Sequence, residues 1–599
     1  MVLGVVVAVL LAMRAAASWD PSMRGWGANS MRFAAPWFGW APWAVAVLLL
    51  VPGVAKRVAP RLAAVGDAMA RNAVAARLGI ALAAAAMVLA LPDRIWLMGD
   101  FLLRLGCARG QIPVTMVFPQ ALPLDLALHH HLPVALERAG LMGSNVWERM
   151  LGAVEAGALA LAAAALARQL GLKGMAAATA TGLIAFSGAL SMFTGYGKGF
   201  VELTLATVAV AVFALRVVRE GRGAWPLAVT VTASLMVHRS AVVLLLPLAA
   251  TALLWWRAHG AAGPGFAGWR SRVPTLAAFA LPVVATLAFA PLLVASIRAV
   301  DARHLAPDPA SPGFAGYPAA IAEAAFSPDH LGQVLNVTFQ SAPFALAAPA
   351  LAMVLAGPLR ATRLRRVPRR EAAVLGAFVL PALAILLFVH PRQGVFRDTD
   401  VFAPSLAALA VAGAALVGEA LRGAGPRAWV GVPALACALF ATLPSLSLAA
   451  DVTRGLDRVR AYLDGPPRRP DEERALLWAF VGEREVGLGA PDRAVAAFER
   501  AVELAPSPRL LIELALAELD RRNYAGAQRA YARAAERLPG YTEAWLGLAD
   551  ASIGARDWPE AERALSRAAA LEPGRREIAM IGRALQVARA REAATGATP

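Results

Sequence analysis

The chain has 599 residues, of which 58% are hydrophobic and only 17% are charged, and its mean hydropathy is +0.56. A soluble protein of this length would carry nearer a quarter charged residues and would divide into several domains. The apolar residues instead gather in blocks of about 17–24, the length that crosses the hydrocarbon core of a bilayer. This pattern excludes a soluble enzyme. The formal net charge of +17 does not indicate nucleic-acid binding, because the arginines lie mostly in short segments between apolar blocks.

The apolar blocks predict about thirteen membrane-spanning helices. They lie near residues 2–13, 36–55, 78–93, 146–167, 174–192, 200–215, 224–237, 240–256, 273–296, 332–356, 372–389, 401–421 and 428–449. The first block is short and reads as a signal peptide, a first span or the remnant of a misplaced start, and we favour a span.

Basic residues predict the orientation of these helices. Arginines and lysines cluster after the even-numbered blocks, from the second to the twelfth. Because basic connections stay in the cytoplasm, the connections after odd-numbered blocks and everything after residue 450 are expected outside it. An Ala- and Arg-rich composition with little Lys is typical of a GC-rich bacterial genome. We therefore expect a multi-pass protein of the bacterial inner membrane.

Ionisable residues next to the predicted spans gather on this outer side, in segments 94–145, 297–331 and 390–400 and in shorter connections. Such residues are costly at membrane depth and therefore indicate a functional site. The candidates are Asp100, Asp125, Lys198, Glu202, His238, Arg392, Arg397, Asp398 and Asp400. Arg392 and Arg397 suit a phosphate group, because guanidinium groups bind oxyanions through two parallel hydrogen bonds.

Several of these residues also have a purely structural interpretation. Asp100 follows a span, where a carboxylate can be solvated or can cap a helix. Glu202 lies in the first turn of a block, where the helix dipole favours a carboxylate. Arg397 and Asp398 can form an internal ion pair. Three consecutive histidines, 129–131, cannot all face one metal ion on a helix, so we expect them to be solvated or interfacial.

Three short segments resemble the GT-C superfamily, membrane glycosyltransferases that use polyprenyl-phosphate-linked sugars. Trp96-Leu97-Met98-Gly99-Asp100 stands where that superfamily keeps the acidic motif of its first outer loop. Tyr196-Gly197-Lys198-Gly199-Phe200-Val201-Glu202 and Arg397-Asp398-Thr399-Asp400-Val401-Phe402-Ala403 are similar to segments of bacterial proteins of this type. The resemblance covers roughly residues 36–449 and implies an all-α, GT-C-like transmembrane domain over residues 1–464.

The resemblance departs from the superfamily at its first motif. That motif often pairs two acidic residues, whereas here Gly99 precedes a single Asp100. We expect no cofactor, and a divalent metal stays open as an alternative.

The composition after about residue 465 becomes charged and Ala-rich. A Pro- and Arg-rich linker, 465–474, precedes three copies of one pattern over 475–590, with a disordered tail expected at 591–599. Alanines align at 494, 527 and 561, and prolines at 506, 539 and 573, which is a period of 33 and then 34 residues. This order resembles the tetratricopeptide repeat, an α-solenoid that binds protein partners in a groove. The predicted groove residues are Trp478, Leu511 and Trp545.

The leading hypothesis is a glycosyltransferase that moves a sugar from a polyprenyl phosphate to a glycan, lipid or protein acceptor. Asp100 would act as general base or would orient the acceptor hydroxyl, while Arg392, Arg397 and Lys198 would stabilise the departing lipid phosphate. Residues for acceptor binding or support would be Asp125, Glu202, His238, Asp398 and Asp400. Membrane lipids and a protein on the repeats are the other expected partners. A non-catalytic scaffold for envelope assembly is the runner-up and a transporter comes third.

Overall fold

The computed structural model describes residues 2–110, 114, 118, 121–259, 266–298, 317–349, 351–352, 368–391 and 393–596. The chain divides into two compact units, Met1–Arg458 and Val459–Pro599. No β-strand occurs in the described part, which confirms the predicted all-α class. Arg392, one of the predicted phosphate-binding residues, lies outside the described residues.

The first unit consists of helices that follow the apolar blocks of the sequence. Its elements are α1 Val2–Trp19, α2 Ser30–Phe33, α3 Trp40–Leu48, α4 Pro52–Ala70, α5 Val74–Ala90, α6 Phe101–Ala108, α8 Pro123–Leu126, η1 Ala127–His131, α9 Leu132–Arg138, α10 Ser144–Gln169, α11 Gly174–Ala185, η2 Gly188–Phe193, α12 Phe200–Glu220, α13 Ala224–Val237, η3 Arg239–Leu244, α14 Leu245–His259, α15 Phe266–Ala288, α16 Ala290–Arg298, α17 Tyr317–Ala325, α18 Pro328–Ser341, α19 Pro343–Leu346, α21 Arg369–Phe388, η5 Thr399–Phe402, α22 Ala403–Arg422, η6 Gly425–Val430 and α23 Gly431–Ala450, followed by α24 Val452–Asp464, within which the unit ends.

Seven of the described helices are long and apolar enough to cross a membrane, or eight if the bent pair α3–α4 counts as one. They are Val2–Trp19, Ser144–Gln169, Phe200–Glu220, Arg239–His259, Arg369–Phe388, Thr399–Arg422 and Gly425–Ala450. Shorter apolar helices, among them α5, α11 and α13, account for other predicted blocks. The first unit is thus built as a membrane protein, but the predicted count of about thirteen spans is not confirmed.

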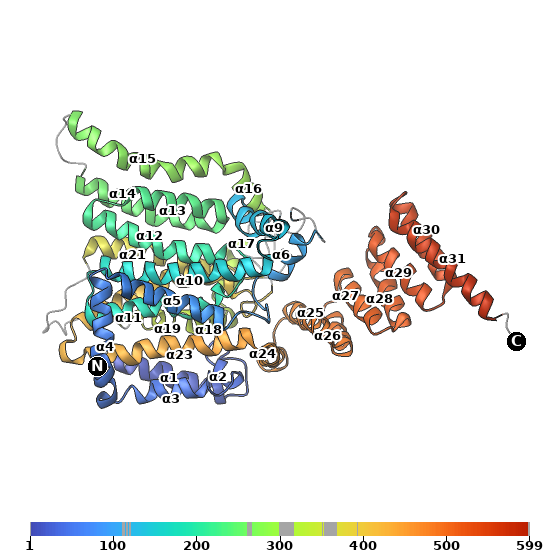
Figure 1. Ribbon diagram of the computed structural model, residues 1–599, viewed down its shortest axis with the longest axis horizontal. Coiled ribbons are helices and arrows are strands. Elements are labelled where there is room, and N and C mark those ends of the chain that lie inside the picture. Colours follow the sequence, from blue (N-terminus) through green and yellow to red (C-terminus); the bar gives the residue numbers. More distant parts are fainter. Residues whose placement is uncertain are drawn as a thin grey trace. The chain divides into compact units, whose positions relative to one another are not determined.

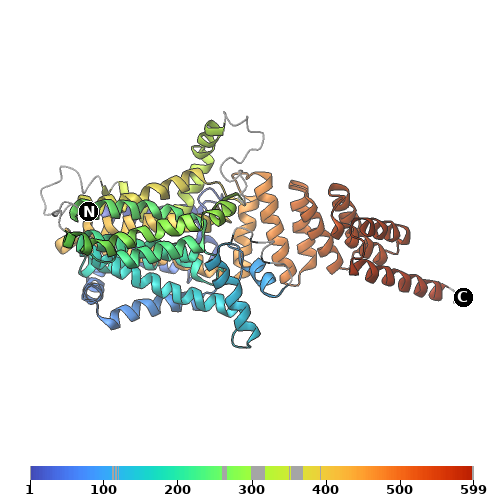
Figure 2. The ribbon, with the colours of Figure 1, turned by 90° about the horizontal axis from the view of Figure 1, so that it is seen from above.

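The long helices of this unit lie side by side, and successive ones run antiparallel, so that connections alternate between two ends of the bundle. Figure 1 shows this arrangement, and Figure 2 gives the same bundle from above. At one end α4 crosses its neighbours, bent by 96° from α3. The Gly174 N–H donates to Asp67 of α4 at 2.8 Å, and Arg219 pairs with Glu371 at 3.2 Å. The 3-10 helix η6, which follows α22, also packs on α4. The basic connections after α10, α12 and α22 therefore lie at the same end of the bundle as α4.

Small residues let these helices approach closely. A Cβ added to Gly66 of α4 would lie 2.0 Å from the Gly174 carbonyl oxygen at the start of α11, and one added to Gly418 of α22 would lie 2.5 Å from Leu172. Neither position has room for a larger side chain. Such contacts are typical of membrane helices, where close packing replaces the hydrophobic effect as the main source of association.

The second unit is a series of helix pairs. Its elements after α24 are α25 Asp471–Gly487, α26 Pro491–Leu504, α27 Pro508–Asp520, α28 Tyr524–Arg537, α29 Thr542–Gly554, α30 Trp558–Leu571 and α31 Arg576–Gly596. The aligned alanines 494, 527 and 561 are completely buried. The small-and-aromatic pattern fills the interfaces: a Cβ at Gly482 would lie 2.8 Å from Phe498, and one at Gly547 would lie 2.3 Å from Tyr531.

Two predictions for this unit need correction. Residues 591–596, predicted as part of a disordered tail, belong to α31, a helix that packs on α29 and α30. Leu511 was predicted to line the groove but is completely buried in the core. Trp478 and Trp545 are half-buried and pack against that core, and the Trp545 indole N–H donates to the Pro539 carbonyl at 2.9 Å.

Candidate functional site

The connection between α5 and α6 places Asp100 at the end of the bundle opposite α4. Asp93 accepts the Trp96 N–H at 2.8 Å, which tightens this connection. Gly99 has a φ of +80°, a conformation that favours glycine. A Cβ there would also lie 2.2 Å from the Tyr196 ring. Gly99 therefore brings Asp100 directly beside the connection that precedes α12.

The connection between α21 and α22 joins the same place. The Thr399 hydroxyl donates to Met98 Sδ at 2.7 Å, and the Tyr196 hydroxyl donates to Asp400. Burial and the negative charge of Asp400 raise the pKa of Tyr196 well above its ordinary value, so the phenol keeps its proton as a donor. The three segments that carry the resemblance thus meet in space, although they are far apart in the chain.

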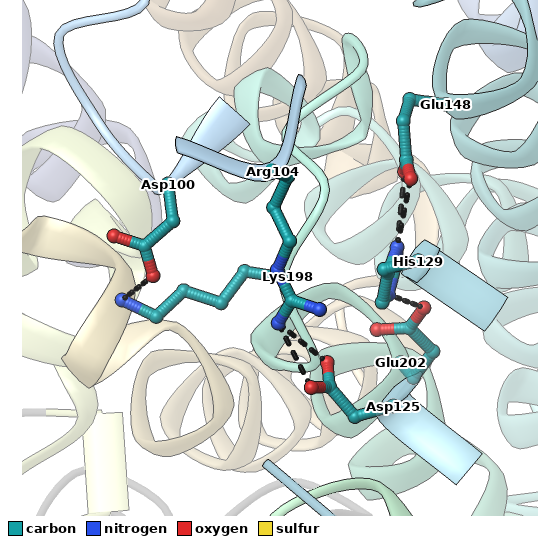
Figure 3. A network of polar contacts seen from close by, with 7 residues as sticks. All are labelled: Asp100, Arg104, Asp125, His129, Glu148, Lys198 and Glu202. Atoms are coloured by element: carbon teal, nitrogen blue, oxygen red, sulfur yellow. Dashed lines mark hydrogen bonds and ion pairs between the residues drawn. The ribbon is translucent and has the colours of Figure 1, made fainter. Parts of the chain in front are cut away.

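Lys198 links two carboxylates at this meeting point. Its Nζ lies 3.1 Å from Asp100 Oδ2 and 3.2 Å from Asp400 Oδ2. Burial disfavours the charged form, but the carboxylates outweigh it and raise the pKa of Lys198. Figure 3 shows the pair with Asp100. Asp400 is almost completely buried and contacts Lys198 from the protein interior. The side chains of Asp100 and Lys198 remain partly exposed.

A second ion pair lies beside the first. Arg104 Nη2 lies 3.0 Å and 2.8 Å from the two carboxylate oxygens of Asp125, and both side chains are buried (Figure 3). The Arg104 guanidinium also stacks over Phe118, 4.2 Å from the ring centroid. Arg104 was missed in the sequence, although it stands one helical turn after Asp100 and so faces the same way.

These groups open onto a cavity of about 760 Å³. Its polar lining consists of Asp100, Arg104, Asp125, Lys198, Thr207, His238, Arg239, Ser240, Gln393, Asp398 and Ser405. Much of its apolar lining comes from η3, α14, α21, η5 and α22 and includes Val242, Val243, Leu244, Pro247, Phe378, Pro381, Ala382, Ile385, Val401, Pro404 and Ala408. One cavity therefore offers charged groups together with a long apolar wall.

Of the residues predicted for the site in the segment 390–400, Asp398 lines the cavity and Arg397 does not. Asp398 lines the cavity, and its Oδ2 accepts the Gln393 N–H at 3.3 Å. Burial and the charge of Asp400 raise the pKa of Asp398 to about 7. Arg397 is adjacent in the chain but is not among the residues that line the cavity.

His238 and Arg239 contribute to the wall between α13 and η3. The His238 Nδ1 accepts the Ser240 N–H at 3.2 Å, and its ring lies 4.5 Å from that of Phe200. Burial and the nearby positive charge of Arg239 lower the pKa of His238 well below its ordinary value, so the imidazole is neutral at pH 7. Arg239 adds a guanidinium group to the cavity lining.

His129 departs from the expectation that the histidine run is solvated or interfacial. It is buried in the π-helical turn η1, with Nδ1 3.0 Å from Glu148 and Nε2 2.8 Å from Glu202 (Figure 3). Burial lowers the proton affinity of His129, but the charges of Glu202 and Glu148 outweigh it and raise its pKa well above the ordinary value. Glu202 therefore holds η1 to α12 and does not line the cavity. No local sequence pattern predicts the contacts of His129 with Glu148 and Glu202, because these residues are far apart in the chain.

In the part of the chain that the structure describes, no group of three or more His, Cys, Asp or Glu side chains is arranged to hold a metal ion. The carboxylates near Lys198 are oriented toward its ammonium group and the Tyr196 hydroxyl instead.

A tetratricopeptide repeat model matches residues 518–585, which run from the end of α27 into α31. No curated protein matches the chain. The C-terminal unit therefore carries tetratricopeptide repeats, as its period predicts. Repeats of this kind generally bind other proteins on their extended surfaces, which supports a protein partner for this unit.

Proposed function

We propose that this protein is a membrane glycosyltransferase of the GT-C type, which transfers a sugar from a polyprenyl phosphate to an acceptor at the outer face of a bacterial inner membrane. The proposal rests on one observation above all: charged and apolar walls share the cavity at the end of the bundle where the three resembling segments meet. A polyprenyl phosphate carries the same combination, a charged head on a long apolar chain.

The apolar wall supports a lipid donor. Side chains of η3, α14, α21 and α22 line it, and these elements belong to helices long enough to span a membrane. An isoprenoid chain can lie along such a wall without losing apolar contacts. The phosphate would then face Lys198 and Arg239, with Arg392 and Arg397 as further candidates from the adjoining segment.

The charged wall supports sugar transfer. The acceptor hydroxyl would attack the anomeric carbon, the bond from that carbon to the phosphate oxygen would break, and the lipid phosphate would leave with the electron pair. Lys198 and Arg239 would stabilise the negative charge that develops on this phosphate. Asp100 would orient the acceptor hydroxyl or take its proton, with Asp125, His238, Asp398 and Asp400 as supporting groups.

The placement of charge at the two ends supports the proposed orientation. The basic connections share the α4 end, which the insertion rule puts in the cytoplasm. The cavity then opens at the outer side, and the tetratricopeptide repeats would recruit a periplasmic protein to it.

The test is a transfer assay with the purified full-length protein in detergent. Undecaprenyl phosphates carrying radiolabelled hexoses or pentoses serve as donors, and release of undecaprenyl phosphate is measured. We expect turnover with one donor, and a loss of about 10²-fold or more in Lys198→Gln, because a charge stabiliser is removed.

The matched control is Glu220→Gln at the opposite end, where Glu220 pairs with Arg216 in an exposed i,i+4 contact. It should keep the wild-type rate. Wild-type protein that releases lipid phosphate from no donor would contradict the proposed function.

The repeats favour a second candidate, a non-catalytic scaffold that anchors them to the membrane. A scaffold would complement a deletion strain when it carries Lys198→Gln and would fail when Trp545→Ala alters the repeat surface. If the protein is an enzyme, the Lys198→Gln variant should fail to complement the deletion strain.

A further inference from the structure

Three carboxylates, those of Asp100, Asp398 and Asp400, lie near Lys198, but their partners differ. Asp100 and Asp400 each lie within 3.2 Å of the Lys198 ammonium group. Among the described residues, the Asp398 carboxylate accepts only the Gln393 N–H, at 3.3 Å, and forms no ion pair. Asp125 also lines the cavity but is paired with Arg104 at 2.8 Å. Among the described carboxylates that line the cavity, Asp398 is therefore the one left available to a bound molecule.

The groups around Asp398 raise its affinity for a proton. The charged and titratable groups around it are Lys198 and Tyr196 before α12, Asp100 at the start of α6, and Arg397 and Asp400 on its own connection. Burial and Asp400 raise its proton affinity, and Lys198 and Arg397 oppose them without cancelling the effect, so that its pKa is about 7. A carboxyl group near half protonation at neutral pH can both accept and return a proton.

Asp100 has the opposite setting. Its contact with the Lys198 ammonium group at 3.1 Å fixes the direction of the carboxylate. A carboxylate held in this way is suited to accept a hydrogen bond from a hydroxyl group and to align it. It is less suited than Asp398 to receive the proton, because its Oδ2 is already engaged by the Lys198 ammonium group.

We propose that Asp398 takes the proton of the acceptor hydroxyl, while Asp100, held by Lys198, orients that hydroxyl for attack. This division of roles rests on the proposed function. The acceptor oxygen forms the new bond to the anomeric carbon, its proton passes to an Asp398 oxygen, and the lipid phosphate leaves with the electrons of the broken bond. Asp398 then returns the proton to water.

The experiment measures the transfer rate against pH for the full-length protein in detergent, using the undecaprenyl-phosphate sugar that the wild type consumes. The wild-type rate should rise with pH and reach half its maximum near pH 7, because the base must be deprotonated. Asp398→Asn should lower the rate by about 10²- to 10⁴-fold and abolish this rise.

Asp100→Asn is the matched variant. It should also lower the rate, chiefly through a higher KM for the acceptor, but should keep the rise with pH. The midpoint should move to lower pH, because the charge of Asp100 is one of those that raise the proton affinity of Asp398.

Two further measurements separate chemistry from folding. Formate should partly restore turnover to Asp398→Ala, because it replaces the missing carboxylate, and should not restore Asp100→Ala. Asp398→Glu keeps a carboxylate and should retain the rise with pH even if the asparagine variant does not fold.

Retention of the rise in Asp398→Asn, or its loss in Asp100→Asn alone, would overturn the assignment while leaving the transferase intact. A wild type that transfers nothing would overturn both.

Discussion

Asp398 should affect the stability of the fold, and the sign of the effect follows from its pKa. The folded pKa of about 7 lies above the ordinary 3.8, so the fold prefers the protonated carboxyl group. The resulting stabilisation is present below about pH 4 and is lost as the pH rises through 7. Asp398→Asn removes the free-energy cost of ionising this buried carboxyl group at high pH. Its thermal midpoint in detergent should therefore exceed that of the wild type at pH 8, with a smaller difference at pH 5. A larger advantage at the lower pH would contradict this sign.

Gly99 offers a second test at a single residue. Gly99→Ala adds a left-handed strain of roughly 1–2 kcal/mol and a contact of 2.2 Å with Tyr196. We expect a lower thermal midpoint and reduced turnover, because Asp100 moves with the connection.

The matched control is Gly110→Ala, since Gly110 has a φ of +72° but no atom within 4 Å of its added Cβ. It carries the strain without the clash. Equal losses in the two variants would show that the contact with Tyr196 is unimportant.

Among the elements, η1 is held in place by the contacts of His129 with Glu148 of α10 and Glu202 of α12, which we call the His129 clamp. Removing one partner of a buried ion pair destabilises by about 3–5 kcal/mol, so His129→Gln should release η1 from α10 and α12. The folded pKa is raised, so the clamp contributes fully below about 6.5 and is lost only as the pH rises through the higher folded value. Limited proteolysis at pH 7 should cut the segment 101–138 faster in this variant. His131→Gln, at an exposed position, should behave like the wild type.

The elements also show what the sequence could and could not predict. Apolar blocks predicted helices because hydropathy is a local property of the chain. The block at 36–55 is one stretch in the sequence but two helices, α3 and α4, because Pro52 starts a new helix at a sharp bend. The alternation of basic connections places Asp100, Lys198 and Asp398 next to spans on one side of the membrane, whereas the contacts of His129 depend on tertiary packing. Leu511 shares its register with two tryptophans, yet its smaller side chain is fully covered.

The division of the whole molecule into two compact units predicts independent folding. Residues 471–599 contain the repeats, whose core is formed by their own helices. Deleting them should leave the first unit with an unchanged thermal midpoint and unchanged transfer to a simple acceptor. Size-exclusion chromatography and the transfer assay check this. Aggregation of the truncated protein would show that the bundle needs the repeats.

The two ends of the bundle should face opposite sides of the membrane. Lys173→Cys lies at the α4 end, and Leu141→Cys lies between α9 and α10, where Leu141 is 75% exposed. A membrane-impermeant maleimide added to spheroplasts should label the cysteine at 141 but not the one at 173. The background is low because Cys107 and Cys437 are both buried. Labelling of both positions from outside would contradict the orientation.

The crossing of α4 has a consequence for immersion depth. Its exposed face carries Lys56, Arg57 and Arg61, while Ala55 and Met69 are buried against the bundle. A helix lying across the bundle with this charge settles among phospholipid headgroups and resists tilt. The 26 residues of α10 then measure about 39 Å, close to the full thickness of a bilayer. With α4 fixed in one headgroup layer, Asp100 is carried to the level of the other, where a phosphate attached to a buried isoprenoid would also come to rest.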